Sequence, residues 1–374
     1  MDILQALTAQ LDIWLDRFEV FFATAPADVQ GCLEVLEEVR RKELNRVTGN
    51  SVLASHALDI EVGVRLAACR DTKSGKIIGC MRVTEAMGVK AEKESIAEYR
   101  LELFSDALLK QTLIFTRLCI LKEHRKSVAS FVLFSKTFSA LLDEGYTAAL
   151  LACEPNLFNM YRKLGARPIG RAHNSLSGGY RIPMVSIPDV AHLTACGSPL
   201  VKVIRKLDPA RAQPFIDWYA TLERKEGEIP LGISPYEGDD EDVPCHRLLT
   251  TGLTKAGAEQ LLQNAMVISC QVGDVLVAER DGGKSIAFVR QGMVDVVVSN
   301  RKLAMLGPGE IFGELAFTLD SVRTASVSAS VPGTEVLLLS MNALQKLDSD
   351  ADRALVWRNL ARCVAQRLVA RTSV

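Results

Sequence analysis

The residue types with the clearest chemistry lie between Ile311 and Ser326. The segment reads IFGELAF, and after a short spacer it continues VRTAS. Gly313 lets the backbone approach a ligand closely, and the free N–H groups of a helix start favour an anion. Arg323 can make a charge-assisted bond to a phosphate, and Glu314 can accept a hydrogen bond from a sugar hydroxyl. A sugar hydroxyl and a phosphate held at so short a spacing indicate a nucleotide.

This segment resembles the phosphate-binding cassette of cyclic-nucleotide-binding domains, whose pattern is F-G-E-[LI]-[AS] followed by P-R-[TSA]-A. The resemblance extends over about residues 245–374 and implies cAMP or cGMP as an allosteric ligand. It implies that Glu314 holds the ribose hydroxyl and that Arg323 holds the cyclic phosphate. Val322 stands where proline is usual. The alternative is a domain that kept the fold and lost the ligand. The implied nucleotide-binding residues are Gly313, Glu314, Leu315, Ala316, Arg323, Thr324 and Ala325.

The elements around this cassette are short β runs separated by glycine turns, from residue 273 to residue 340. They predict a small antiparallel β-roll, flanked by helices over residues 255–265, 342–347 and 351–371. The last helix carries Trp357, Leu360 and Val364 at helical spacing, so it needs a partner. That partner is its own β-roll, the other domain, or a second chain in a homodimer. About thirty residues follow the last strand, which leaves no room for a DNA-reading module, and we expect no nucleic-acid partner.

A second set of chemical residues lies in the first half of the chain. Arg82 and Arg117 interrupt apolar runs that predict buried strands. A buried arginine is costly unless it is paired, so the two either line a polar pocket or form structural ion pairs. Glu85 follows one of these strands and is a candidate proton acceptor, as are Asp59 and Glu98. The pattern therefore indicates a polar site on a predicted sheet.

A basic turn precedes the helix predicted over residues 127–144. His124, Arg125 and Lys126 form a positive cluster just before Ser127. Such a cluster suits the phosphate of a phosphopantetheine arm or the acidic surface of an acyl carrier protein. A solvated basic turn is the alternative.

The elements of this half alternate between helix and strand. Helical patterns cover residues 1–22, 27–47, 127–144 and 156–164, and strand patterns cover residues 62–69, 76–84, 113–121 and 146–153, with another strand beginning at 167. The strands over 113–121 and 146–153 are apolar at almost every position, which is typical of strands buried on both faces. We therefore predict an α/β (α+β) fold: a mixed sheet with flanking helices, followed by the antiparallel β-roll.

This order resembles the GNAT-type N-acyltransferase fold over about residues 20–190. The most specific local match is Glu154-Pro155-Asn156 followed by YRKLGA at 161–166. The resemblance implies that Asn156 and the basic turn bind the acyl donor and that Tyr161 protonates the leaving thiolate. The family's coenzyme A enzymes usually carry [RQ]-x-x-G-x-[GA] here, whereas residues 123–130 contain no glycine. That departure favours an acyl carrier protein as the donor and leaves coenzyme A open.

Three further motifs resemble one branch of that family, the acyl-homoserine-lactone synthases and long-chain N-acyl amino acid synthases. They are VRRKEL at 39–44, GCMRVT at 79–84 and TRLCI at 116–120. Ile114 replaces the glutamate of the lactone synthases, and their tryptophan near the first helix is missing. The resemblance therefore implies an amide product, such as an N-acyl amino acid, rather than a lactone.

Composition sets the outer limits. The chain has 374 residues, 48% of them hydrophobic and 24% charged, with a formal net charge of −1; these values exclude a largely disordered chain and a basic nucleic-acid footprint. A Gly-, Pro- and acid-rich stretch at 225–244 divides it into domains over 1–205 and 245–374, joined by a helix and linker over 206–244. No apolar run spans a membrane, and nine cysteines without a C-x-x-C pair indicate free thiols in the cytoplasm. We expect no metal and no covalent cofactor.

Together these patterns predict an N-acyltransferase that moves an acyl group from acyl-ACP or acyl-CoA to a small-molecule amine under cyclic-nucleotide control. Arg82, Glu85, Arg117 and Tyr161 are its candidate catalytic residues, and His124, Arg125, Lys126, Ser127 and Asn156 are its candidate donor-binding residues. Two alternatives stay open. One is a cAMP-regulated protein lysine acetyltransferase, and the other is a cyclic-nucleotide sensor without catalysis.

Overall fold

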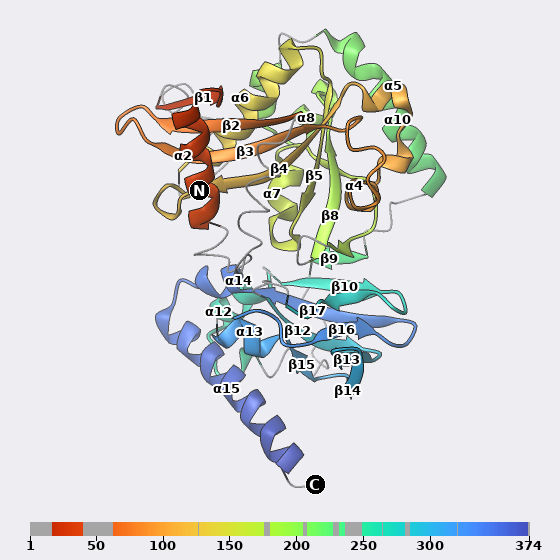
Figure 1. Cartoon of the computed structure of the whole chain (residues 1–374). Helices are drawn as coiled ribbons and strands as arrows, with labels where there is room; N and C mark the ends of the chain where they lie inside the picture. Colours follow the sequence, from red (N-terminus) through yellow and green to blue (C-terminus); the bar gives the residue numbers. More distant parts are fainter. Residues whose placement is uncertain are drawn as a thin grey trace. The chain divides into compact units, whose positions relative to one another are not determined.

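A computed structural model describes residues 17–39, 63–125, 127–175, 180–204, 208–226, 232–235, 249–263, 265–280, 285–319 and 321–372. The chain forms two compact units (Figure 1). Unit 1 contains residues 1–153, 157–170 and 182–230, and unit 2 contains residues 154–156, 171–181 and 231–374. Two short segments from the first half of the sequence thus belong to the C-terminal unit. Lys126 and Asp59 lie outside the described residues.

The centre of unit 1 is a mixed sheet in the order β1-β2-β3-β4-β5-β8-β6. Every pair in it is antiparallel except β4 with β5, which is parallel. The short strand β7 pairs with the start of β8. The strands are β1 (Phe18–Phe22), β2 (Val64–Asp71), β3 (Ile77–Glu85), β4 (Thr112–Ile120), β5 (Ala148–Cys153), β6 (Arg167–Pro168), β7 (His173–Asn174) and β8 (Tyr180–Ser186).

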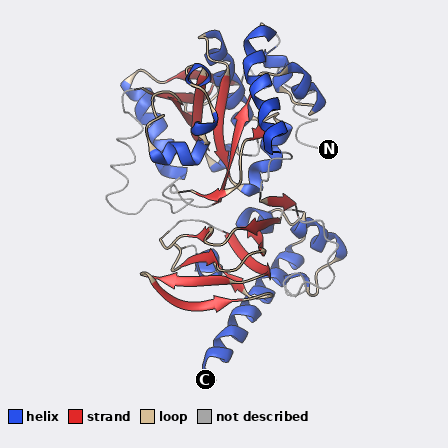
Figure 2. Cartoon of the chain, turned by 90° about the vertical axis from the view of Figure 1, so that its right-hand side faces the viewer, coloured by secondary structure: helices blue, strands red, loops and turns tan. Residues whose placement is uncertain are grey.

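Helices cover both faces of this sheet (Figure 2). On one face α2 (Pro26–Glu37) packs Cys32, Val35 and Leu36 against Cys80 of β3 and Cys119 of β4. On the other face α6 (Ala129–Asp143) places Phe134 and Phe138 at 5.4 and 6.1 Å from the ring of Phe115. The remaining helices of unit 1 are α4 (Lys93–Tyr99), η2 (Leu101–Leu103), α5 (Asp106–Leu109), η3 (Lys122–His124), α7 (Phe158–Lys163), α8 (Val190–Ala195), α9 (Leu200–Ile204) and α10 (Pro209–Glu226).

The predicted strands β2 to β5 and helices α2, α6 and α7 are present, so the prediction of a mixed α/β sheet is confirmed. The amphipathic helix expected over residues 1–22 is wrong at its end, because Phe18–Phe22 is strand β1. That segment holds three phenylalanines and a valine, which favour strands, and it pairs with β2. Residues 1–16 and 40–62, which hold the rest of two expected helices, lie outside the described residues.

Unit 2 is built on two antiparallel sheets, in the orders β15-β12-β17-β10-β9 and β11-β16-β13-β14, which confirms the predicted antiparallel fold. Their strands are β9 (Ile233–Pro235), β10 (Met266–Cys270), β11 (Val275–Val277), β12 (Ser285–Gln291), β13 (Val294–Val298), β14 (Arg301–Leu306), β15 (Ile311–Phe312), β16 (Ser326–Ala329) and β17 (Thr334–Ser340). Strand β9 lies within the stretch expected to be linker and pairs with β10. The helices are η4 (Pro155–Leu157), α12 (Lys255–Leu262), α13 (Glu314–Leu319), α14 (Met341–Gln345) and α15 (Asp350–Thr372).

The first half of α15 packs on its own unit. Val356 and Leu360 are buried in one core with Leu261 and Leu339. Asn359 donates to the carbonyls of Leu249 and Thr251 at 3.0 and 2.9 Å. The buried stripe therefore includes the predicted Leu360, and Val356 is a member that was not predicted.

Trp357, expected within the stripe, is 37% exposed. Leu360 is buried as predicted, and Val356 joins it in place of Trp357. The start of the helix is anchored to α12 by Asp352. Its buried carboxylate accepts hydrogen bonds from the Thr254 amide and hydroxyl at the start of α12.

No helix among the described residues is long and apolar enough to cross a membrane. Eight of the nine cysteines lie in the described part of the chain, and all eight are free thiols. Six of these are buried; Cys196 is exposed and Cys363 is half-buried. Cys245 lies outside the described residues.

Candidate functional site

The nucleotide cassette of unit 2 is brought together by one tight turn. Strand β15 ends at Phe312, Gly313 adopts φ +78°, and α13 begins at Glu314. A side-chain Cβ at position 313 would come within 2.4 Å of Arg323 Nη1 and 3.0 Å of the Ser285 carbonyl oxygen. Only glycine combines this positive φ with so close an approach. The turn thus depends on residue type as the sequence predicted.

Arg323 follows α13 in the sequence, and its side chain reaches back to this turn. Its side chain is buried, with 4% of the residue exposed. Nη1 donates to the Gly313 carbonyl oxygen at 2.9 Å, and Nη2 donates to the Ser285 hydroxyl at 3.0 Å. These bonds hold a positive charge beside the start of α13. Ser285 was not identified from the sequence, because it lies 38 residues away and only the pairing of β12 with β15 brings it here.

The other predicted nucleotide-binding residues surround this turn with differing exposure. Glu314 is half-buried and Leu315 is 44% exposed, while Ala316 is buried. Thr324 is exposed and Ala325 is half-buried at the approach to β16. The ring of Trp357 on α15 lies 5.6 Å from that of Phe317 on α13. The C-terminal helix therefore packs against the helix within the cassette, a contact between distant segments that sequence spacing does not reveal.

In unit 1 the hydrogen-bonded stretch between the parallel strands β4 and β5 is much shorter than the strands themselves. β4 pairs with β5 only from Thr112–Ala148 to Ile114–Leu150, although β4 continues to Ile120 and β5 to Cys153. Beyond that point the two strands do not hydrogen-bond to each other. Buried backbone groups are normally paired, so an extended ligand with amide groups can add itself to such an edge.

Arg117 marks a bulge in β4 beyond this point. Cys80 pairs with Cys119 but Arg82 pairs with Thr116, so β4 carries one extra residue. Arg117 has φ +52°, the left-handed region that costs a non-glycine residue about 1–2 kcal/mol. Residues 116–118 are partly exposed between buried neighbours. Bulges and strained residues cluster at functional sites, which makes this bulge a candidate site.

Arg82 and Thr116 share the sheet face that carries α2. They are cross-strand neighbours, and Arg82 lies two residues from Cys80, which packs against α2. The hydroxyl oxygens of Thr84 and Thr116 are buried and have no hydrogen-bond partner in the described part of the chain. A buried hydroxyl left unbonded costs about 1–3 kcal/mol. Both threonines lie within the motifs GCMRVT and TRLCI, but the sequence analysis named only the arginines of these motifs as candidate site residues.

Glu85 does not join Arg82. Side chains alternate along a strand, so Glu85 lies on the opposite face, where its carboxylate accepts a hydrogen bond of 2.6 Å from the Tyr146 hydroxyl. This bond, with burial of the phenol, raises the pKa of Tyr146 to about 12. Glu85 is exposed and engaged with Tyr146. The structure thus separates two residues that the sequence grouped.

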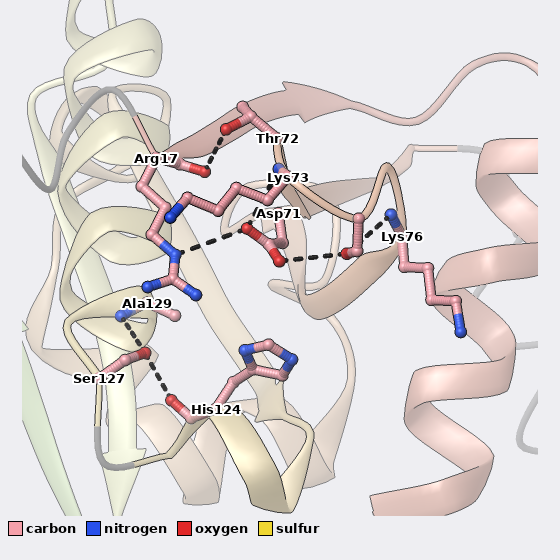
Figure 3. Close-up of polar contacts among 9 residues, drawn as sticks. Arg17, Asp71, Thr72, Lys73, Lys76, His124, Ser127 and Ala129 are labelled. Atoms are coloured by element: carbon pink, nitrogen blue, oxygen red, sulfur yellow. Dashed lines mark hydrogen bonds and ion pairs between the residues drawn. The ribbon is translucent and has the colours of Figure 1, made fainter.

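The basic turn lies at the start of α6, as Figure 3 shows. The Ser127 hydroxyl donates to the His124 carbonyl oxygen at 2.6 Å and accepts from the Ala129 amide at 3.2 Å. Arg17 lies between this turn and Asp71, with its Nε 3.6 Å from the carboxylate. Arg17 is a cation near the turn that the sequence did not identify. His124 is half-buried and Arg125 is exposed, with Nε donating to the Ile120 carbonyl oxygen.

Tyr161 lies on the face of the sheet that α6 covers. Its ring is 6.5 Å from that of Phe134, which itself contacts Phe115 of β4. Tyr161 and Arg82 therefore approach the sheet from opposite faces. Asn156 is in the short helix that follows β5, and its side chain lies outside the described residues.

Comparisons with known proteins assign the C-terminal segment. Residues 267–350 match the family model "Cyclic nucleotide-binding domain". The chain is 30% identical over 87 residues to a "cAMP-dependent protein kinase regulatory subunit" of Yarrowia lipolytica, covering 23% of each chain. It is 28% identical over 122 residues to the "Pycsar effector protein BcPycTIR" of Burkholderia cepacia, covering 32% of this chain and 39% of that one. The chain thus spans well under half the length of these relatives.

A solved structure from Lactobacillus plantarum, described as a putative N-acetyltransferase, is similar over 46% of this chain and 97% of its own. Its identity is 14% and its TM-score is 0.34. The family match and the antiparallel sheets around Gly313 and Arg323 lead to one conclusion: the C-terminal unit carries a cyclic nucleotide-binding domain.

Proposed function

We propose that the chain is an N-acyltransferase that transfers an acyl group from a thioester to an amine under the control of a cyclic nucleotide. The observation that carries the proposal is the early end of the β4–β5 pairing beside the Arg117 bulge. An acyl thioester on a phosphopantetheine arm has amide groups that can pair with the unpaired strand edge. Unit 1 also has the element order that resembles the GNAT-type fold. A protein that only senses the nucleotide would not need a strained residue at this strand.

The donor would lie on the face that carries α6 and α7. In our proposal His124, Arg125, Lys126 and Ser127 bind its phosphate at the start of α6. Ser127 already engages the Ala129 amide, so the cationic side chains matter more here than free amides do. This arrangement favours an acyl carrier protein, whose surface is acidic, while coenzyme A remains the second donor.

The chemistry is a substitution at the thioester carbonyl. The amine nitrogen forms a bond to the carbonyl carbon, the C–S bond breaks, and the thiolate leaves. In our proposal Tyr161 protonates that thiolate, and backbone N–H groups beside the bulge stabilise the oxyanion. The amine loses one proton to water or to a carboxylate. Arg82 and Arg117 would position the acceptor on the other face.

The nucleotide would bind at the Gly313 turn. Arg323 would hold the cyclic phosphate and Glu314 the ribose, with Leu315, Ala316, Thr324 and Ala325 completing the cassette. The buried Arg323 and the missing side chain at position 313 fit a phosphate close to the backbone. Because Arg323 bonds to Gly313 and Ser285, we expect it to reorient when the phosphate binds. cAMP and cGMP are both candidates.

The test is a product search with purified full-length chain. The chain is incubated with decanoyl-ACP, decanoyl-CoA or acetyl-CoA and a mixture of amines, with and without cAMP and cGMP, and products are identified by mass spectrometry. We expect N-decanoyl amides whose rate depends on nucleotide. Arg323→Ala should abolish the dependence and leave basal transfer. Absence of any amide with all three donors would exclude the transferase and leave a sensor.

A further inference from the structure

Two short stretches in the first half of the chain belong to the C-terminal unit. Residues 154–156 and 171–181 group with unit 2, whereas the residues on both sides of each stretch belong to unit 1. Strand β8 crosses this division, because it begins at Tyr180 in unit 2 and continues to Ser186 in the sheet of unit 1. A rigid strand carries a displacement of its start along its length, so an event in unit 2 can reach that sheet through β8.

Arg171 attaches the chain before β8 to the antiparallel sheets of unit 2. Its Nη2 donates to the Ser269 carbonyl oxygen and lies 3.2 Å from the Asp274 carboxylate. Gly232 leaves room for the Arg171 side chain, since a Cβ at that position would come within 3.1 Å of it. Strand β7 begins two residues after Arg171 and contacts β11. We call residues 171–175 the β7 segment.

The β7 segment also pairs with the start of β8. His173 lies opposite Arg181, and Asn174 lies opposite Tyr180. Arg181 is buried, and its Nη1 lies 3.3 Å from the carboxylate of Glu154, the residue that directly follows β5. The β7 segment therefore holds the start of β8, and β8 holds the end of β5.

This arrangement bears on the edge of β5 that we assign to the thioester arm. Residues 151–153 pair with β8 and lie beyond the end of the pairing between β4 and β5. The last pair on this side is Cys153 with Ile182, directly beside Glu154 and Arg181. The position of the edge therefore depends on β8 and on what holds the start of β8.

Asp274 connects the β7 segment to the nucleotide cassette. Its carbonyl oxygen accepts a hydrogen bond of 3.0 Å from the amide of Ala329, the last residue of β16. β16 begins at Ser326, three residues after Arg323, the proposed phosphate ligand. Since we expect Arg323 to reorient when a cyclic phosphate binds, β16 is the neighbouring element that must accommodate the change. Asp274 would move with it.

We propose that the β7 segment is the connection through which the nucleotide controls acyl transfer, with the Arg171–Asp274 ion pair as its attachment. This inference rests on the proposed N-acyltransferase function and names how that function is regulated. A bound nucleotide moves β16, Asp274 displaces the β7 segment through Arg171, and β8 changes the position of the edge of β5. The nucleotide acts by favouring one of two positions, since a ligand shifts an equilibrium only through its differential affinity.

The experiment measures the response, which is the factor by which saturating cAMP or cGMP changes the transfer rate. Full-length chain, Arg171→Gln, Asp274→Asn and the double variant are assayed with decanoyl-ACP and a mixture of amines. Asparagine can still accept the hydrogen bond from the Gln271 amide but removes the charge beside Arg171.

We expect a wild-type response of about fivefold or more, and a response below about twofold in Arg171→Gln. Asp274→Asn should also lower the response. The double variant should match Arg171→Gln, because both changes break one connection. The rate without nucleotide should stay near wild type in all three. A full response in both single variants would overturn the proposal.

Arg290→Gln is the matched control. Arg290 on β12 lies 3.3 Å from the carboxylate of Glu335 on β17, so this variant breaks another ion pair of unit 2 outside the β7 segment. It should keep the full response. An equal loss of response in Arg290→Gln and Arg171→Gln would show that the effect is not specific to the β7 segment, and would also overturn the proposal.

Hydrogen exchange separates this inference from the function it rests on. If no donor is turned over, the transferase proposal fails, and the connection is judged by the exchange of peptides covering residues 148–156 and 180–186. We expect cAMP or cGMP to change this exchange in wild type and in Arg290→Gln but not in Arg171→Gln, although calorimetric titration still detects binding to all three. Unchanged exchange in wild type, or no binding of either nucleotide, would overturn the connection.

Discussion

Gly313 in unit 2 and Arg117 in unit 1 both have positive φ, of +78° and +52°. The glycine adopts this conformation at no steric cost, and its missing side chain leaves space for Arg323. The arginine pays about 1–2 kcal/mol for it, in the middle of a strand whose flanking residues are buried. One site is therefore relaxed and the other is strained. Strain that persists in a fold is held by its surroundings and points to function.

The two sites also differ in how the chain assembles them. Gly313, Glu314 and Arg323 lie within eleven consecutive residues, so a local turn forms most of the cassette. Arg82, Thr84 and Thr116 come from two strands whose register is shifted by the bulge. A substitution in the cassette should act on the turn itself, whereas a substitution at the bulge should act through the sheet. Three predictions test this contrast.

The largest effect is expected from Gly313→Ala. The new Cβ would approach Arg323 Nη1 to 2.4 Å and the Ser285 carbonyl oxygen to 3.0 Å, and it adds strain at positive φ. We expect cyclic-nucleotide affinity to fall by about a hundredfold, or about 2.8 kcal/mol, in calorimetric titration. Gly333→Ala is the matched control, because φ there is +71° and nothing lies within 4 Å of a new Cβ. The Gly333→Ala variant should keep its cyclic-nucleotide affinity. Equal losses of affinity in both variants would show that backbone strain at positive φ, and not the contact with Arg323, causes the effect.

A smaller effect separates strain from function at Arg117. Arg117→Ala and Arg117→Gly remove the same guanidinium, and only alanine retains the steric cost of φ +52°. We expect the glycine variant to be about 1–2 kcal/mol more stable than the alanine variant, which shifts Tm by about 2–8 °C for a unit of this size. Both should lose acyl transfer while nucleotide binding is kept. Equal Tm values would mean that the bulge stores no strain, and full activity in either variant would place Arg117 outside the site.

The smallest effect concerns acid stability in each unit. Burial raises the pKa of Asp71, but hydrogen bonds from the Lys73 amide and Ser74 hydroxyl, together with Arg17, outweigh it and hold the pKa below its usual value. Hydrogen bonds from Thr254 and Ser349 likewise lower the pKa of Asp352. A lowered folded-state pKa means that the stabilisation is fully present above the unfolded value, near pH 4, and is lost as pH falls through the folded pKa.

Hydrogen-exchange mass spectrometry across pH 2–7 can measure the loss of stability with falling pH for each unit separately. We expect Asp71→Asn to lower protection in unit 1 at neutral pH and to flatten its acid dependence, and Asp352→Asn to do the same in unit 2. At pH 2 each variant should match wild type. If protection in either variant still fell with pH as it does in wild type, other carboxylates would be responsible for the acid dependence of that unit.

The prediction from sequence succeeded where one segment holds the whole signal. Strands β4 and β5 and helix α6 were predicted correctly, because the apolar pattern within each segment is enough to indicate its type and its burial. The sequence order allowed a helix between β3 and β4 but gave it no bounds, because α4 and α5 have only seven and four residues. In α15 the sequence placed Leu360 in the buried stripe correctly but chose Trp357 instead of Val356, because nothing in the sequence shows that Thr254 binds the Asp352 carboxylate.

The sequence by itself indicated the turn at Gly313 and the arginine that returns to it, because both residues lie within one short segment. Only the tertiary structure decided that Ser285 supports Arg323, that Glu85 and Arg82 lie on opposite faces, and that Thr84 and Thr116 lie on one face. The physical reason is register: a single extra residue in β4 changes which side chains are neighbours across the sheet. Nothing in a linear pattern of residue types states where that extra residue lies.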